Sequence, residues 1–205
     1  MKKNKISKNW LIKQKKDPFF RQSKIYGYRS RSAFKLIEMN KKFNFLKKSL
    51  SLLDLGSSPG GWSQVAKEKI LTGKILAIDI EPMKQINNVN FIKGDFRENK
   101  IFDKIKIYFN NRADIVLSDA AANTTGNKNL DSYKTGELCL SAMNLAIKIL
   151  NRDGVFLSKM FMGSVYKEIN EKAKENFRNV VKYKPFSSKK ESKEIYIFCK
   201  GVLKI

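Results

Sequence analysis

The sequence predicts an α/β fold in which a mostly parallel β-sheet carries helices on both faces. Short apolar runs typical of buried strands alternate along the chain with longer stretches of helical periodicity. The first clear strand, 51–55, passes through a glycine-rich turn into a helix, as in doubly wound sheets. The last two apolar runs are joined by a short connection, which predicts an antiparallel hairpin at the C-terminus.

Taken in order, the apolar runs predict a seven-stranded sheet. The expected strands are 51–55, 74–80, 90–93, 113–119, 155–161, 179–184 and 194–200. The expected helices begin after residue 30 or 32 and continue at about 62–70, 96–110, 131–150 and 165–177. The longest has Leu138, Ala142, Leu145 and Ile149 on one face, and a turn is expected at 151–154.

The first of these helices carries a lysine near its N-terminus. Ser30 or Ser32 can cap it, and Phe34 and Ile37 lie on its apolar face. Lys35 falls in the first turn, where periodicity alone indicates an ordinary surface lysine.

Length and composition indicate one globular domain. The chain has 205 residues, 42% of them hydrophobic, which is enough for a sizeable core. We expect residues 28–205 to form that domain and residues 1–27 to form a basic arm that is partly disordered. No apolar run of about 18 residues is present, so neither a membrane span nor a membrane partner is expected. Cys139 and Cys199 are interpreted as buried free thiols, which favours a cytoplasmic location.

The net charge of +23 indicates a polyanionic partner, nucleic acid before membrane. The first 50 residues hold 16 Lys or Arg against Asp17 and Glu38, a net charge of +14. Lys outnumbers Arg 35 to 7, so a genome-wide composition bias is an alternative source of the charge. Aromatic residues are interleaved with the basic ones over residues 1–30. They could stack on RNA, dock on the core, or do both.

The glycine turn after the first strand differs from phosphate-binding loops. Three residues separate Gly56 from Gly60, so G-x-G-x-x-G is absent, and Trp62 stands where G-x-x-x-x-G-K requires lysine. The turn suits S-adenosylmethionine, a nucleoside cofactor without phosphates; alternatively, it merely closes a βαβ unit. Asp79 lies 19 residues after Gly60, close to the offset at which an acid accepts hydrogen bonds from ribose hydroxyls. That offset favours the cofactor interpretation.

Two further acids follow strands, at the sheet edge where α/β folds bind ligands. Asp95 follows Gly94 and could accept from an adenine amino group or cap the next helix, and Asp119 ends the fourth strand. Lys159 interrupts an apolar strand, although lysine is rarely buried without a partner; a snorkelling edge lysine is the alternative. The chain has no His, which excludes a His general base and an imidazole zinc site, and no metal is expected.

Several motifs resemble those of the FtsJ/RrmJ (RlmE) family of large-subunit ribosomal RNA 2′-O-ribose methyltransferases. The resemblance covers nearly the whole chain, from about Trp10 to the C-terminus. The matching stretches are YRSRSAFKLIE (28–38), DLGSSPGGWS (54–63), DIEPM (79–83), GDFR (94–97), Ser118-Asp119, Lys159 before Met160-Phe161, and SKEIYI (192–197). The resemblance implies a Rossmann-like S-adenosylmethionine-dependent methyltransferase fold. One departure is the loop Ala120-Ala121-Ala122-Asn123, where the family usually has Met-Ala-Pro-Asn.

The resemblance also implies the site residues. The family's catalytic Lys-Asp-Lys-Glu tetrad falls on Lys35, Asp119, Lys159 and Glu194. Its cofactor contacts fall on Gly60, Trp62, Asp79, Asp95 and Asp119, to which the turn adds Gly56. The implied reaction is methylation of a uridine ribose in 23S-type ribosomal RNA on the assembled large subunit, and we expect a monomer.

The tetrad residues suit this chemistry, in which a ribose 2′-hydroxyl attacks a sulfonium methyl group. The enzyme must align oxygen, methyl and sulfur and remove one proton. Lys159 is the proposed general base and must first lose its own proton. Burial and Lys35 favour that loss, whereas Asp119 and Glu194 oppose it.

Three other classes of protein are disfavoured by the sequence. An RNA-binding protein that keeps the fold without catalysis is disfavoured by the intact tetrad. A nicotinamide-dependent oxidoreductase is disfavoured by the glycine spacing. A methyltransferase acting on a small molecule or a protein is disfavoured by the basic arm and by the hairpin lysines Lys189, Lys190 and Lys193.

Overall fold

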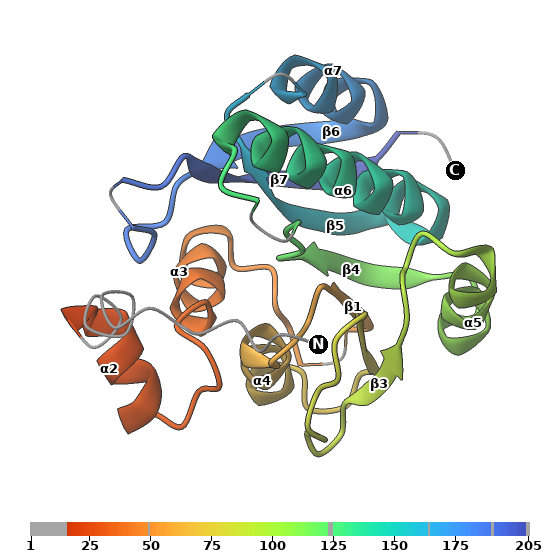
Figure 1. Ribbon diagram of the computed structural model, residues 1–205. Coiled ribbons are helices and arrows are strands. Elements are labelled where there is room, and N and C mark those ends of the chain that lie inside the picture. Colours follow the sequence, from red (N-terminus) through yellow and green to blue (C-terminus); the bar gives the residue numbers. More distant parts are fainter. Residues whose placement is uncertain (1–15, 49, 123–124, 164, 190, 204–205) are drawn as a thin grey trace.

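The computed structural model describes residues 16–48, 50–122, 125–163, 165–189 and 191–203. Within them, one seven-stranded sheet runs in the order β3-β2-β1-β4-β5-β7-β6 (Figure 1). The strands are β1 (Leu52–Leu55), β2 (Ile75–Asp79), β3 (Asn90–Lys93), β4 (Ala113–Ser118), β5 (Leu150–Phe161), β6 (Phe177–Tyr183) and β7 (Glu194–Val202). The helices are α2 (Pro18–Ile25), α3 (Ala33–Phe43), α4 (Gly61–Lys69), α5 (Asn99–Phe109), α6 (Lys128–Ile149) and α7 (Tyr166–Asn176).

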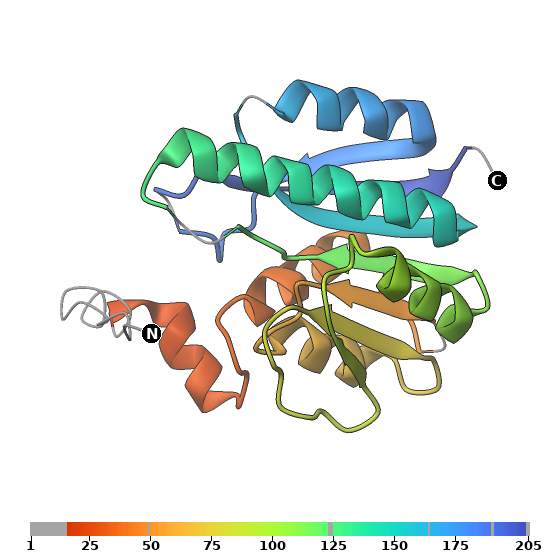
Figure 2. The ribbon, with the colours of Figure 1, turned by 45° about the vertical axis from the view of Figure 1, so that its right-hand side comes forward.

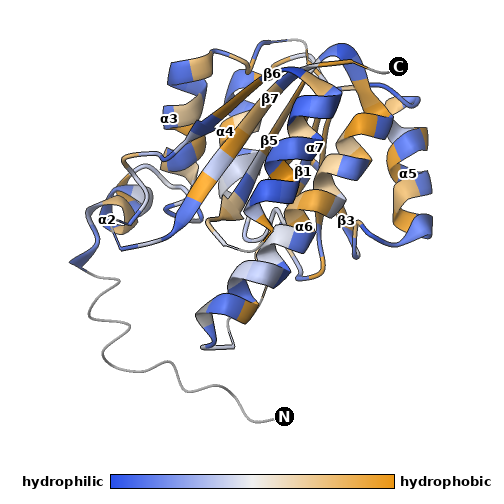
Figure 3. Ribbon diagram, turned by 90° about the horizontal axis from the view of Figure 1, so that it is seen from above, coloured by the Kyte–Doolittle hydropathy of each residue, from blue (hydrophilic) through white to orange (hydrophobic). Residues whose placement is uncertain are grey.

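The sheet is the middle layer of three. Figure 3 shows α3 and α4 on one face and α5, α6 and α7 on the other, with ribbons coloured by residue hydropathy. Successive strand residues point to opposite faces, so Leu52 packs with α3 and α4 while Leu53 and Leu55 pack with α5 and α6. Covering both faces explains why the central strands β1, β2 and β4 are almost continuously apolar. The predicted α/β class is confirmed.

The parallel pairing brings three chain segments to one edge of the sheet. Leu55 of β1 pairs with Ile78 of β2 on one side and with Ser118 of β4 on the other. The residues that follow, including Asp79 and Asp119, therefore lie at the same carboxyl edge. This alignment is why strand-end acids far apart in the sequence can share one site.

The C-terminal hairpin supplies the only antiparallel pairs among the named strands of the described chain. Strand β7 pairs with both β5 and β6, which confirms the predicted hairpin. In the β5–β7 register Lys159 lies opposite Tyr196, and Phe161 lies opposite Glu194. The start of β7 is thus placed beside the end of β5.

One boundary prediction was wrong, and one capping prediction was right about the position but not about the hydrogen bond. The turn expected at 151–154 lies inside β5, because the β4–β5 register shifts between the pair Ala113–Leu150 and the pair Ile115–Val155. The shift accommodates the extra residues without ending the strand. Ser32 occupies the N-cap position of α3 but makes no capping bond; its hydroxyl lies 2.7 Å from the Ser30 hydroxyl instead.

Part of the basic arm is ordered. Helix α2 was not predicted; Asp17 caps it by accepting from the backbone N–H groups of Phe19 and Phe20. Figure 2 shows α2 at the margin of the molecule, and Phe19 and Tyr26 place their rings against Phe34 of α3. The described end of the arm therefore docks on α3. The disorder expected for the first several residues falls on 1–15, outside the described residues.

Two smaller expectations concern the thiols and the membrane. Both cysteines are free and buried, as predicted, and burial raises the pKa of Cys139 to about 12. Over the described stretches, none of the helices combines the length and apolar character that crossing a bilayer requires.

Candidate active site

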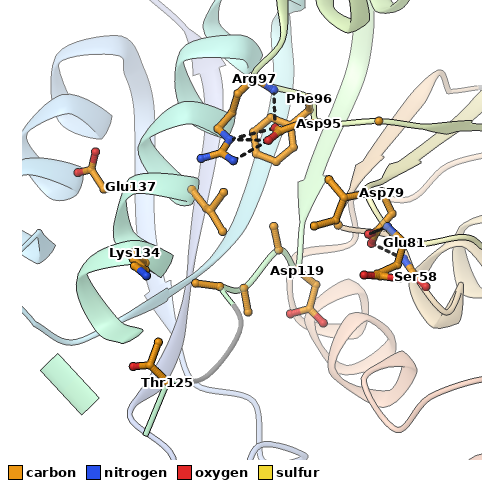
Figure 4. Close-up of a pocket in the computed structure, with 17 residues that line it drawn as sticks. Ser58, Asp79, Glu81, Asp95, Phe96, Arg97, Asp119, Thr125, Lys134 and Glu137 are labelled. Atoms are coloured by element: carbon orange, nitrogen blue, oxygen red, sulfur yellow. Dashed lines mark hydrogen bonds and ion pairs between the residues drawn. The ribbon is translucent and has the colours of Figure 1, made fainter. Parts of the chain in front are cut away.

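A cavity of about 840 Å³ opens at the carboxyl edge of the sheet (Figure 4). Its lining comes from the ends of β1, β2, β3 and β4 and from α6. The lining residues are Gly56, Ser58, Asp79, Ile80, Glu81, Gly94, Asp95, Phe96, Arg97, Asp119, Ala120, Ala121, Ala122, Thr125, Lys134, Glu137 and Leu138. Four of the predicted cofactor residues, Gly56, Asp79, Asp95 and Asp119, are brought together here.

Gly56 is required by the close approach of two loops. Its φ of +71° lies in the region that favours glycine, and an added Cβ would come within 2.5 Å of the Ala120 Cα. The turn after β1 therefore contacts the loop after β4, with no room for a side chain. Three residues of the loop that differs from the family's usual sequence, Ala120, Ala121 and Ala122, form part of the same cavity wall. Asn123 lies outside the described residues.

The Asp79 carboxylate holds both neighbouring turns. One of its oxygens accepts from the backbone N–H of Ser58 and the other from that of Glu81, each at 2.8 Å. A carboxylate has about four acceptor sites, so each oxygen keeps capacity for a ligand hydroxyl.

The Asp95 carboxylate is bound by its near neighbour Arg97. The Arg97 side chain donates to both carboxylate oxygens, and its backbone N–H donates to one of them at 3.0 Å. The Arg97 hydrogen bonds, against the effect of burial, hold the pKa of Asp95 below its ordinary value. Asp95 does not cap α5, because Glu98 occupies that position.

Gly60 and Trp62 are not among the residues lining the cavity. The indole of Trp62 is buried, donates to the carbonyl of Ser32 at 2.9 Å and packs against the Tyr196 ring. Its side chain holds the entry to α3. The assignment of Gly60 and Trp62 as cofactor contacts stays a prediction. Because the Trp62 side chain is buried elsewhere, such a contact would use the Trp62 backbone at the start of α4.

The four residues of the expected tetrad form two ion pairs, and they come from α3, the loop after β4, β5 and β7. Lys159 of β5 lies 3.1 Å from the Asp119 carboxylate, and Lys35 of α3 lies 2.5 Å from the Glu194 carboxylate. The Lys159 ammonium also donates to the Asp119 carbonyl at 2.6 Å. Both lysines are largely buried, so Lys35 is not the surface residue that periodicity indicated, and Lys159 is not a snorkelling one.

Tyr196 connects the two pairs and was missed in the sequence. Its hydroxyl donates to Asp119 at 3.0 Å, and the Lys35 ammonium lies 5.7 Å from its ring centroid. The side chain is fully buried, and burial, followed by the charges of Asp119 and Glu194, raises its pKa well above the ordinary value. Tyr196 therefore remains a donor. Its position two residues after Glu194 on a strand, hence on the same face, was the available signal.

Asp119 belongs to both the cavity and the tetrad. Burial alone would raise its pKa, but the charges of Lys159 and Lys35 and the hydrogen bonds from Lys159 and Tyr196 hold the pKa below its ordinary value. It is therefore a carboxylate at neutral pH. A molecule in the cavity and a substrate beside Lys159 would meet at this residue.

Asp54 is a second buried carboxyl group at this edge. It accepts from the Ser63 hydroxyl at 2.6 Å, whereas its other oxygen has no partner among the described residues. Burial raises its pKa to about 7, opposed by the Ser63 hydrogen bond and assisted by the charges of Asp119 and Asp79. The folded protein therefore keeps a proton on Asp54 that the unfolded chain loses near pH 4.

Asp54→Asn is expected to remove a pH dependence of stability. Between about pH 4 and pH 7 the folded state binds the extra proton, so the free energy of unfolding of the wild type falls as the pH rises, by up to about 1.4 kcal/mol per pH unit. The stability of the variant relative to wild type should rise over this window and level off above it. Urea unfolding at pH 5, 6, 7 and 8 measures the difference. Asp103→Asn, an exposed acid on α5, should show no such trend; a flat difference for Asp54→Asn would contradict the assignment.

The fold and site together define the class of Rossmann-like methyltransferases. The antiparallel strand β7 lies between β5 and the edge strand β6, and a cavity of nucleoside size, whose lining includes the three strand-end acids Asp79, Asp95 and Asp119, opens at the carboxyl edge of the sheet. Among the described residues there is no group of three or more acids or cysteines placed to hold a metal ion.

Comparison with known proteins identifies the family. The model of the FtsJ-like methyltransferase family matches residues 28–202, and the chain belongs to this family. It is 48% identical over 200 residues to the ribosomal RNA large subunit methyltransferase E of Pelagibacter ubique, covering 98% of each chain. The enzyme of the same name from Rickettsia conorii is 40% identical over 202 residues, which cover 96% of this chain and 89% of that one. A solved structure described as a ribosomal RNA methyltransferase of Plasmodium falciparum is 37% identical, with a TM-score of 0.77 over 87% of this chain and 100% of that one.

Proposed function

We propose that this chain is an S-adenosylmethionine-dependent enzyme that methylates the 2′-oxygen of a uridine ribose in large-subunit ribosomal RNA on the assembled subunit. The names of the relatives support the substrate. The main observation that supports this reaction is that Asp119 both lines the cavity and forms an ion pair with Lys159. A methyl donor in the cavity would then lie next to the group that receives the substrate proton.

The cavity residues fit the cofactor. A volume of about 840 Å³ falls within the roughly 300–1,000 Å³ of small-molecule sites. Asp79 would accept from the ribose hydroxyls, and Asp95 from the adenine amino group, with Arg97 holding its carboxylate in place. When bound, the cofactor supplies a methyl group made electrophilic by its sulfonium.

The tetrad would position the ribose hydroxyl and remove its proton. Asp119 orients the Lys159 ammonium through its carboxylate and its carbonyl, and Glu194 orients that of Lys35 through its carboxylate alone. With a neutral amine, Lys159 takes the hydroxyl proton as the oxygen attacks, which is general-base catalysis. Lys35 remains the nearby cation. All four residues come from one chain, so the proposal needs no second subunit.

The basic N-terminal arm, residues 1–27, would contact the RNA outside the site, while residues 28–205 form the catalytic domain. Its described part places α2 beside α3, the helix that carries Lys35, so RNA held by the arm would lie near the tetrad. Phosphate neutralisation by Lys and Arg supplies most sequence-independent affinity. A ribosomal substrate also places the reaction in the cytoplasm.

Asp79→Ala is expected to weaken S-adenosylmethionine binding by roughly 10- to 150-fold, the equivalent of about 1.5–3 kcal/mol for hydrogen bonds to a charged group. Because Asp79 also holds the N–H groups of Ser58 and Glu81, Asp79→Asn is the finer variant and should give a smaller loss. Isothermal titration measures both, with Asp103→Ala as the exposed-acid control. Unchanged affinity in Asp79→Ala would remove this residue from the cofactor site.

The proposed substrate is tested by offering three acceptors with methyl-labelled S-adenosylmethionine. They are large subunits lacking the modification, small subunits, and protein-free large-subunit RNA. Label should enter the large subunits and leave the small subunits blank, with protein-free RNA a poorer acceptor. Equal transfer to protein-free RNA would contradict the requirement for an assembled subunit, and transfer to none of the three would contradict the function.

A further inference from the structure

The loop between β6 and β7 presents an aromatic ring to solvent. Phe186 is 82% exposed, whereas the neighbouring Pro185, Ser187 and Ser188 are buried. In Figures 1 and 2 the loop projects beyond the sheet on the side of α2 and α3. Most of this large apolar side chain is therefore exposed to water, which is unfavourable in free energy, and no contact within the described chain removes that exposure.

The backbone beneath this ring is firmly held. Glu38 of α3 accepts from the N–H of Phe186 at 2.6 Å, and from the N–H and the hydroxyl of Ser187 at 3.1 Å each. It also accepts from the Tyr183 hydroxyl at 2.6 Å. Burial would raise the pKa of Glu38, but these four hydrogen bonds hold it below its ordinary value, so the anchor is charged at neutral pH. An anchored backbone lowers the entropic cost of binding with this ring.

A second cavity, of about 830 Å³, lies between this loop and α2. Phe19 and Phe186 line it with ring centroids 6.3 Å apart, in edge-to-face orientation. Its lining holds four Lys or Arg and two acids, a net charge of +2, and Lys16 and Lys189 are exposed among the cations. An exposed ring beside basic side chains fits single-stranded nucleic acid, because bases stack on rings and phosphates meet cations.

One residue that lines this cavity, Ser188, is hydrogen-bonded to the tetrad. The Ser188 hydroxyl donates to Glu194 at 2.8 Å, and Glu194 pairs with Lys35. Two residues of chain span at most about 7 Å, so Phe186 lies close to the group that touches Glu194. A nucleotide whose base stacks on Phe186 would therefore lie close to the nucleotide whose ribose is bound at the tetrad.

We propose that Phe186 is a stacking platform for an unpaired base of the substrate RNA, next to or near the methylated nucleotide, with Lys16 and Lys189 meeting the flanking phosphates. This inference rests on the proposed function for the identity of the RNA. The stacking contact itself depends only on the exposed ring, its anchored backbone and the basic cavity beside it.

The test compares Phe186→Ala and Phe186→Trp with the wild type on two short probes. One is a single-stranded oligouridylate and the other an abasic oligomer of equal length and charge. Phe186→Ala should weaken oligouridylate binding by roughly 5- to 150-fold, the range of base–aromatic stacking. It should leave abasic binding and cofactor affinity unchanged. Phe186→Trp should restore binding, with its added fluorescence quenched by oligouridylate and not by the abasic probe.

Ile107→Ala on α5 is the matched control, because Ile107 is 81% exposed on the opposite face of the sheet. Equal binding of both probes by the wild type, or an unchanged Phe186→Ala, would overturn the proposal. A loss seen only with assembled subunits would assign the ring to a ribosomal protein and overturn it too. Methyl transfer by the wild type is scored separately, so failure of the proposed function leaves the stacking result to be read by itself.

Discussion

Lys159→Met is expected to slow methyl transfer by roughly 100- to 10,000-fold, the usual worth of a general base. Met keeps the length and packing of the side chain but removes the ammonium group that bonds Asp119. Cofactor affinity should stay close to that of the wild type, because Lys159 does not line the cofactor cavity. Single-turnover methyl transfer and isothermal titration separate these two quantities.

The matched control for this variant is Lys200→Met. Lys200 lies on β7 opposite Val155 of β5, but its side chain is exposed. Turnover of the control should match the wild type. If Lys159→Met kept a third of the wild-type rate with methyl transfer shown to limit that rate, Lys159 could not be the base.

Asp119→Asn is expected to impair both cofactor binding and methyl transfer. The amide cannot balance the Lys159 charge, and the cavity loses a carboxylate, so turnover should fall at least as far as in Lys159→Met while cofactor affinity also weakens. Loss of affinity together with turnover distinguishes a residue shared by both sites from one that acts only on the hydroxyl. Unchanged cofactor affinity would contradict the shared position.

The same variant has a signature in stability. Since the folded pKa of Asp119 is lowered, its carboxylate stabilises the fold above its ordinary pKa of about 4, and this contribution is lost as the pH falls through the lowered value. Asp119→Asn should therefore be less stable than the wild type at pH 7, by up to about 3 kcal/mol, with a gap that narrows in acid. A gap independent of pH would contradict the electrostatic account.

The central strands β1, β2 and β4 could be predicted from the sequence because each is a short apolar run that is buried on both faces. The turn expected at 151–154 failed for a tertiary reason: pairing with β4 on both sides of these residues, at Leu150 and again from Val155, keeps them within the strand although they locally favour a turn. Helix α2 was missed because its aromatics are interleaved with basic residues and resemble an unstructured arm.

The acids of the site were predictable for a topological reason. The carboxyl ends of parallel strands meet at one edge, so Asp79, Asp95 and Asp119 could be placed together from their positions alone. The pairing of Lys35 with Glu194 could not, because it joins a helix to a distant hairpin strand and needs the β5–β7 register. Only the family resemblance pointed to these two residues, and Tyr196 escaped because a buried tyrosine in a strand needs no functional explanation.

The most direct test of the central claim is to identify the atom that receives the methyl group. Large-subunit RNA labelled by the wild-type protein is digested to nucleosides and separated. The account predicts that the label is recovered as 2′-O-methyluridine, and that a substrate with 2′-deoxyuridine at the same position binds but accepts no label. Label on a base, or transfer to the deoxy substrate, would contradict the assignment of the tetrad to a ribose hydroxyl.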